Sequence, residues 1–207
     1  MSQPTSRHTS DHTTIWLARH GEVHNPNDVL YGRLPRFDLS VNGVRQAQAL
    51  STFLAGHPLA AVYSSPLLRA RRTAGHIVAG RNGLPIRQDS GLLEVKTGWQ
   101  GRPSREMVGV DWYARPHSPG DDSLHSIRDR TSAWVRRVLA RHPGQHVAAV
   151  SHGDPILILV GHLRGTPLEP RHLFPTGYIP TACVFKLVLD SAGRLIEDQM
   201  FVPHAAG

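Results

Sequence analysis

Two histidines occupy the same kind of position in this chain. His20 follows the apolar run Thr14–Ala18, His152 follows the run His146–Val150, and a glycine comes directly after each histidine. Short apolar runs of this length indicate buried strands. Ligands of open parallel sheets bind beyond the carboxyl ends of the strands, and a glycine there lets the backbone turn sharply. If the two strands are neighbours, His20 and His152 face one another at one site.

The residue types around this pair fit phosphoryl transfer, which needs a nucleophile, fixed positive charge and a proton source. His20 would attack as a neutral imidazole, and Arg19 would hold phosphate oxygens through its forked donors. Arg69 falls in the first turn of a helix expected to begin at Ser65-Pro66, where the helix N-terminus also favours anions. A carboxyl group such as Glu94 could supply the proton.

The elements that must position these residues alternate between strand and helix. Further strands are expected at Leu59–Tyr63 and Leu84–Gln88, with a final strand pair at Ala182–Leu189 and Leu195–Val202. Ser40, Ser65-Pro66, Ser123 and Asp154-Pro155 mark helix starts, and residues 90–120 form a long loop or small helical excursion. This order predicts an α/β layered fold with a mostly parallel sheet.

Composition indicates one ordinary globular domain. The chain has 207 residues, 40% of them apolar and 19% charged, so residues 14–207 are expected to form a single domain after a disordered arm at 1–13. Its one cysteine, Cys183, excludes an intrachain disulfide. No run approaches the roughly 18 apolar residues of a membrane helix, and the first 14 residues carry no secretory signal. We therefore expect a cytoplasmic protein with no membrane partner.

The net charge of +7 comes from arginine, because only Lys96 and Lys186 are lysines. The arginines are spread along the chain and aromatic residues make up only 6% of it, which disfavours nucleic acid as a partner. Small anionic molecules are favoured weakly. With a single cysteine the chain has no C-x-x-C ligand pair, and we expect neither a metal nor another cofactor.

The sequence resembles the histidine phosphatase superfamily, the phosphoglycerate-mutase-like proteins. Six motifs match in order: Leu17–Glu22 (LARHGE), Tyr31–Arg33 with Asp38–Ala47, Val62–Ala74, Leu92–Gly101 (LLEVKTGWQG), Gly120–Ser123 and Val150–Gly153. They span about two-thirds of the chain, and six ordered matches are far more specific than one R-H-G triplet. The resemblance implies a three-layer sandwich, with helices flanking a mostly parallel central sheet.

The resemblance also implies roles for individual residues. His20 matches the nucleophile that becomes phosphohistidine, Arg19, Arg69 and His152 match the phosphate pocket, and Glu94 matches the proton donor. The matching family needs neither a metal nor an organic cofactor.

Some positions depart from the family pattern. Asn25 lies five residues after the nucleophile rather than six, so it is a candidate for substrate binding and not for the phosphate pocket. Arg33 and Asp122 are the other candidates for substrate binding. Asp122 stands where the family has glutamate at a helix entry, and it is the second candidate for the acid.

The preferred function is a phosphomonoester hydrolase acting through phosphohistidine on a small phosphorylated metabolite. A phosphoglycerate mutase is the alternative, and a non-catalytic phosphoester-binding regulatory protein is a weaker one. Oligomeric state, monomer or homodimer, stays open. Specificity is expected in residues 22–36 and 97–121, whose Arg33, Arg36, Arg102, Arg105, Trp99, Trp112 and Tyr113 suggest an anionic or partly aromatic ester.

Overall fold

A six-stranded sheet forms the centre of the molecule. The computed structural model describes residues 12–111, 113–114, 118–174 and 178–204. The strands are β1 (Thr13–Arg19), β2 (Leu59–Ser64), β3 (Ile86–Gln88), β4 (His146–Ser151), β5 (Val184–Leu189) and β6 (Leu195–Phe201). They lie in the order β3-β2-β4-β1-β5-β6, and the first four are mutually parallel. The sheet is mixed because β5 and β6 form the expected antiparallel pair, with β5 beside β1.

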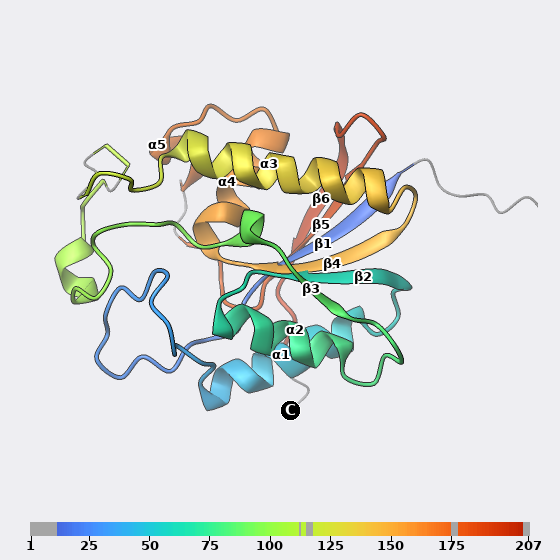
Figure 1. Ribbon diagram of the computed structural model, residues 1–207, viewed down its shortest axis with the longest axis horizontal. Coiled ribbons are helices and arrows are strands. Elements are labelled where there is room, and N and C mark those ends of the chain that lie inside the picture. The colour runs from blue at the N-terminus through green and yellow to red at the C-terminus, as the bar shows by residue number, and fades with distance from the viewer. Residues whose placement is uncertain (1–11, 112, 115–117, 175–177, 205–207) are drawn as a thin grey trace, which may run out of the picture.

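Helices cover both faces of this sheet (Figure 1). On one face lie α1 (Val41–Leu54) and α2 (Leu68–Val78), and on the other lie α3 (Leu124–Arg141) and α4 (Gly153–Leu163). A short helix, α5 (Pro170–Leu173), packs beside α4. The predicted three-layer α/β arrangement is therefore confirmed.

Alternation along the central strands divides the core into two layers. In β1, Ile15 and Leu17 join the cluster under α3 and α4, while Trp16 and Ala18 join the cluster over α1 and α2. Neighbouring strand β4 alternates in the same way. Side chains of a strand point to opposite faces in turn, so a central strand covered on both faces is apolar throughout. This burial fixes the register in which the ends of β1 and β4 meet.

Local capping explains where α1 and α3 start, whereas α2 starts later than the sequence predicts. Ser40 accepts a hydrogen bond from the Gly43 amide, and Ser123 forms a capping box with Ser126, as the sequence predicts for α1 and α3. The prediction that α2 begins at Ser65-Pro66 is wrong, since that helix begins at Leu68. The Ser65 hydroxyl accepts a hydrogen bond from the Leu67 amide and is within 2.8 Å of His152 Nε2, so it serves the site instead.

The remaining boundaries differ only slightly from expectation. Thr13, assigned to the arm by its sequence, is the first residue of β1, and its hydroxyl donates to the His142 carbonyl. The rest of the arm, residues 1–11, lies outside the described residues. The long loop contains two short 3₁₀ helices, η1 (Ser90–Leu92) and η2 (Ser104–Met107). No helix in the described part of the chain has both the length and the apolar character to cross a membrane.

Candidate active site

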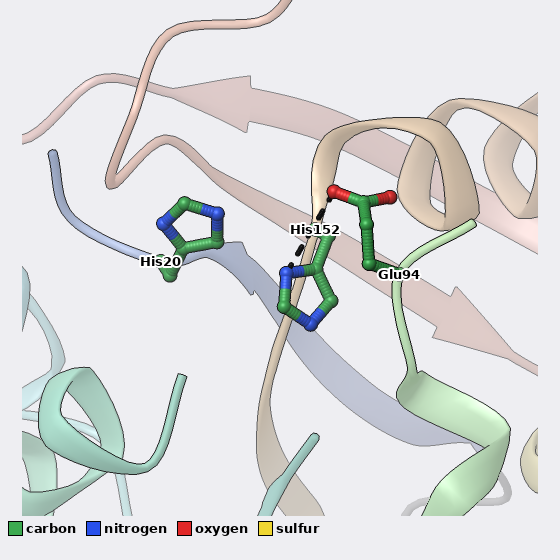
Figure 2. Close-up of side chains that lie close together, drawn as sticks. All are labelled: His20, Glu94 and His152. Carbon is green, nitrogen blue, oxygen red and sulfur yellow. Dashed lines mark ion pairs between the residues drawn. The ribbon is translucent and has the colours of Figure 1, made fainter. Parts of the chain in front are cut away.

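His20 and His152 meet at the carboxyl ends of two adjacent parallel strands. The β1–β4 ladder ends at Arg19 beside Ser151, so the residues that follow emerge side by side. Both histidines are completely buried, and their ring centroids are 5.1 Å apart. The pairing inferred from two similar strand ends is present in the structure (Figure 2).

Hydrogen bonds around His20 define which nitrogen carries its proton. Nδ1 lies 2.7 Å from the Gly21 carbonyl, which can only accept, so Nδ1 is protonated. Nε2 then holds the lone pair, and Arg69 Nε donates to it at 3.2 Å. Burial first, and then the charges of Arg69 and Arg19, hold the pKa of His20 well below its ordinary value. The ring is a neutral imidazole with a nucleophilic Nε2.

Two glycines allow the chain to place this histidine. A Cβ on Gly21 would lie 2.5 Å from the Gly43 carbonyl oxygen, and a Cβ on Gly43 would lie 2.0 Å from the Glu22 carbonyl oxygen. The loop after β1 therefore rests directly on the start of α1. Gln46 accepts a hydrogen bond from the Glu22 amide, and Thr73 accepts one from the Gly21 amide. These contacts fix the backbone on the carboxyl side of His20.

Two arginines bring positive charge to this site. Arg69, in the first turn of α2, is fully buried, and its Nη2 donates to the Gly32 carbonyl at 2.7 Å. Arg19 Nη1 donates to the Ile179 carbonyl, and its guanidinium lies 4.7 Å from the centre of the Tyr178 ring. Arg19 Nε is buried and has no hydrogen-bond partner among the described residues. A buried donor of this kind suits an anion, because buried polar groups are nearly always paired.

His152 offers a second unpaired donor. Ser65 Oγ is 2.8 Å from its Nε2, and since that hydroxyl already accepts from Leu67, it donates to the imidazole. The proton of His152 then resides on Nδ1, which is buried and has no hydrogen-bond partner among the described residues. Burial, followed by the charge of Arg69, keeps the pKa of His152 well below its ordinary value. A neutral N–H donor therefore faces the same space as Arg19 Nε.

Glu94 lies across from the histidines, just after η1. Its Oε2 is 3.8 Å from His152 Nδ1, as Figure 2 shows, and its Oε1 accepts a hydrogen bond from the Val95 amide. Burial first, and then the Asp154 carboxylate, raises the pKa of Glu94 to about 7, although Arg69 opposes the shift. A carboxyl group with this pKa is protonated in a large fraction of molecules near neutral pH. It is suited to donate a proton.

Beside the site is a cavity whose lining includes Arg19, Glu94 and Tyr178, and Asp122 and Arg33 lie outside that lining. Arg33 Nη2 is 2.7 Å from Asp122 Oδ2, and Arg33 Nε donates to the Glu94 carbonyl. Asp122 also accepts from the Lys96 amide and lies 3.5 Å from Arg130. Neither of the two lines the cavity. They hold the backbone of the Glu94 loop, which does not suit Asp122 for the role of acid.

Asn25 does line the cavity, but its amide is used locally. Asn25 Nδ2 donates to the Val29 carbonyl, and Oδ1 accepts from the Val29 amide, closing a short loop. Trp112, expected among the specificity residues, lies outside the described residues.

The sequence reasoning missed Asp154 and Tyr178. The sequence marks Asp154, which follows His152-Gly153, only as a helix start. In the structure Asp154 lines the cavity, and desolvation raises the pKa of its carboxyl group. Tyr178 Oη donates to Asp154 Oδ1 at 2.6 Å and packs against Gly153, where a Cβ would lie 2.1 Å from that oxygen. The one available signal was an acidic residue two positions after a site histidine.

The same cluster offers ligand atoms that a metal could use. One atom each from His20, Glu94 and His152 lie within 4.8 Å of one another. The charges of two guanidinium groups, those of Arg69 and Arg19, act on both histidines of this cluster. Positive charge at this density favours an anion over a cation.

Comparison with known proteins agrees with this geometry. Residues 15–199 match the family model of the histidine phosphatase superfamily, branch 1. The chain is 37% identical to the uncharacterized protein Rv0525 of Mycobacterium tuberculosis over 78% of this chain and 84% of that one. It is 33% identical to phosphoserine phosphatase 1 of Hydrogenobacter thermophilus over 74% and 77% of the two chains.

Solved structures show the same fold. Bacillus stearothermophilus YhfR has a TM-score of 0.78 at 28% identity, covering 94% of this chain and 98% of its own. Mycobacterial glucosyl-3-phosphoglycerate phosphatase Rv2419c has a TM-score of 0.75 at 25% identity, with coverage of 94% and 100%. Given a match over nearly its whole described length, the chain belongs to the histidine phosphatase superfamily, branch 1, whose members are phosphatases or mutases.

Proposed function

We propose that this protein is a phosphomonoester hydrolase that works through a covalent phosphohistidine on His20. The observation that carries the proposal is the tautomer of His20, with Nδ1–H on the Gly21 carbonyl and the Nε2 lone pair directed to Arg69. A nucleophile in this form lies beside the unpaired donors of Arg19 and His152. These two donors, together with Arg69, would surround the oxygens of a transferring phosphoryl group.

The first half-reaction follows from these positions. Nε2 attacks phosphorus, the bond from phosphorus to the ester oxygen breaks, and Glu94 gives its proton to the departing oxygen. The alcohol leaves, and the phosphoryl group stays on Nε2. The Gly21 carbonyl stabilises the imidazolium character that develops, because it accepts from Nδ1–H. Arg69 and Arg19 offset the charge on the phosphoryl oxygens.

The second half-reaction uses the same groups in reverse. Glu94, now a carboxylate, takes a proton from water as the water oxygen attacks phosphorus. The bond from phosphorus to Nε2 breaks, inorganic phosphate leaves, and His20 and Glu94 return to their starting states. A pKa of about 7 lets Glu94 serve as acid and then as base at neutral pH.

The named relatives support hydrolysis of an ester but do not agree on the alcohol. Hydrogenobacter thermophilus has a relative named phosphoserine phosphatase 1, and Escherichia coli has one named adenosylcobalamin/alpha-ribazole phosphatase. A small phosphorylated metabolite as substrate and a cytoplasmic location remain proposals for this chain. So does the absence of nucleic-acid and membrane partners.

Product analysis separates hydrolysis from mutase activity. With p-nitrophenyl phosphate we expect inorganic phosphate to accumulate in step with p-nitrophenol, and with 3-phosphoglycerate we expect no 2-phosphoglycerate to form. Phosphate is measured with molybdate, and 2-phosphoglycerate with a coupled enolase assay. Formation of the 2-phospho isomer without phosphate would instead identify a mutase. Binding of vanadate without turnover of any ester would identify a non-catalytic phosphoester-binding protein.

Activity is expected to survive removal of divalent metals. If Arg19, Arg69 and His152 supply the positive charge, dialysis against excess EDTA should leave kcat/KM within about twofold of its starting value. Vanadate, which adopts the geometry of pentacoordinate phosphorus, should inhibit the dialysed enzyme. A large loss of activity that one metal restores would show that His20, Glu94 and His152 hold an ion.

A further inference from the structure

The cavity above the site is far larger than a phosphate group needs. Its volume is about 680 Å³, in the range of pockets that enclose a whole small organic molecule. Of the site residues, Arg19 and Glu94 line this space, so the phosphoryl group would lie at the end of it that they form. The rest must receive the leaving alcohol, so its lining determines the substrate class.

That lining is mostly apolar and aromatic. The walls include Leu30, Tyr31, Val110, Tyr113, Phe174 and Tyr178. The rings of Tyr113 and Phe174 are nearly parallel, with an angle of 4° between their planes. Aromatic walls of this kind gain most from a ligand that also buries apolar surface.

Apart from Arg19, the ionisable side chains with a formal charge on the described walls are acidic. The charged residues that line the cavity are Arg19, Asp28, Glu94, Asp111 and Asp154. Arg19 is used by the phosphoryl group, so the leaving alcohol meets carboxyl groups and no other arginine or lysine of the described lining.

The arginines expected to attract an anionic ester lie elsewhere. None of Arg33, Arg36, Arg102 and Arg105 lines the cavity. Arg33 pairs with Asp122, and Arg102 lies over the Trp99 ring with its Nη1 3.8 Å from Glu106. The described lining therefore gives these arginines no contact with an ester in the cavity, whereas Tyr113, named with them as a specificity residue, does line it.

Asp154 fixes the two tyrosines that form one side of the cavity. Tyr113 Oη donates to Asp154 Oδ2 at 2.5 Å, and Tyr178 Oη donates to Asp154 Oδ1 at 2.6 Å. The Tyr178 ring is also held by the Arg19 guanidinium over its face. Residues from two separate loops are thus tied to the first turn of α4. Walls held in place by hydrogen bonds lose little conformational freedom when a ligand binds.

We propose that this cavity selects phosphomonoesters whose leaving alcohol or phenol is aromatic or otherwise apolar and carries no further negative charge. The inference rests on the proposed hydrolase function. It extends that function by assigning specificity to the walls formed by Tyr113, Tyr178 and their tether Asp154, and to the carboxylates Asp28 and Asp111.

Three alkyl phosphates with nearly equal leaving-group basicity test this selection. They are 3-phenylpropyl phosphate, n-propyl phosphate and 3-(4-carboxyphenyl)propyl phosphate, which differ only at a distance from the reacting oxygen. We expect kcat/KM for the phenyl ester to exceed that for the propyl ester about tenfold to a hundredfold, as burial of a phenyl ring implies. The carboxyphenyl ester should be at least about fivefold poorer than the phenyl ester, because it brings a charge against carboxylates.

Variants assign the selection to the named walls. Tyr113→Ala should reduce the preference for phenyl over propyl at least about threefold, and Tyr113→Phe, which keeps the ring but loses the bond to Asp154, should reduce it less. Asp28→Asn with Asp111→Asn should raise kcat/KM for the carboxyphenyl ester, relative to that for the phenyl ester, about two- to fivefold. Asp129→Asn with Asp190→Asn removes the same charge away from the cavity and should leave that ratio unchanged.

The outcomes distinguish this inference from the proposed function. If kcat/KM is equal or reversed for the phenyl and propyl esters, or for the phenyl and carboxyphenyl esters, the proposed selection is overturned while hydrolysis stays intact. If no ester is hydrolysed, p-nitrophenyl phosphate included, the hydrolase proposal fails, and the dissociation constants of the three esters then test the selection directly. Measuring those constants with His20→Ala also separates binding from turnover, and the same order of preference is expected.

Discussion

Replacing His20 by alanine is expected to reduce phosphatase activity by a factor on the order of 10⁴–10⁶, the loss seen when a covalent nucleophile is removed. The reason is geometric, because Nε2 of His20 carries the nucleophilic lone pair, and the hydrogen bonds to Arg69 and the Gly21 carbonyl hold the buried ring in place. Wild-type protein quenched during turnover of a ³²P-labelled ester should carry acid-labile, alkali-stable label. His20→Ala should carry none.

His76 provides the matched control for this experiment. It lies in the last turn of α2, on the same helix as Arg69 but away from the cavity lining. His76→Ala should keep both label and activity. Label that persists in His20→Ala would place the phosphoryl group on another residue and contradict the proposed mechanism. Thermal unfolding of both variants establishes that the comparison is between folded proteins.

Glu94→Gln is expected to slow phosphorylation of His20 about 10²–10⁴-fold with alkyl phosphates, the usual contribution of a general acid. The effect should be much smaller with p-nitrophenyl phosphate, whose leaving phenolate hardly needs a proton. Glutamine keeps the size and polarity of the side chain but cannot act as the acid. Single-turnover rates are the proper measurement, since steady-state rates can report dephosphorylation instead.

The pH dependence provides a second readout of the same residue. Only protonated Glu94 can donate, and its pKa is raised to about 7. Wild-type phosphorylation by an alkyl phosphate should therefore be fastest below pH 7 and fall as the pH rises through 7. This decline should be absent in Glu94→Gln.

Two other carboxyl groups serve as comparisons for Glu94. Asp122→Asn should weaken the ion pair with Arg33 and slow both classes of ester by similar, smaller factors. If Glu94→Gln slows alkyl and aryl esters equally, Glu94 is not the acid. Asp154, which lines the cavity and whose pKa is raised by desolvation, would then be the next residue to test.

Much of the fold and the centre of the site could be predicted because their signals are local. The interiors of β1 and β4, residues 15–18 and 147–150, are apolar at every position, since both faces of each strand are covered, and each strand is followed by a histidine and a glycine. Ser40 and Ser123 also predict where their helices start, because each caps its helix through short-range hydrogen bonds. The family motifs added the role of Glu94 as proton donor, which no local pattern assigns.

The remaining features depend on partners that are distant in the chain. Ser65 looks like a helix cap until the structure shows that its hydroxyl bonds to His152. Asp122 looks like a second acid until Arg33, 89 residues away, is seen to pair with it. The hydrogen bonds of Tyr113 and Tyr178 to Asp154 require two loops to come together at the first turn of α4, and no sequence periodicity predicts such a contact. Side chains whose role depends on tertiary contacts of this kind cannot be assigned from sequence spacing.

The position of β1 in the sheet has a consequence for folding during synthesis. β1 is made first, yet both of its neighbours, β4 and β5, come from the last third of the chain. The Trp16 indole, for example, bonds to His146 across 130 residues. Long-range pairing of this kind is slow, because a large loop must close before the contact forms. The apolar strand that ends in the nucleophile must therefore wait, unpaired, until most of the protein has left the ribosome, and His20 enters its site only when the sheet closes around it.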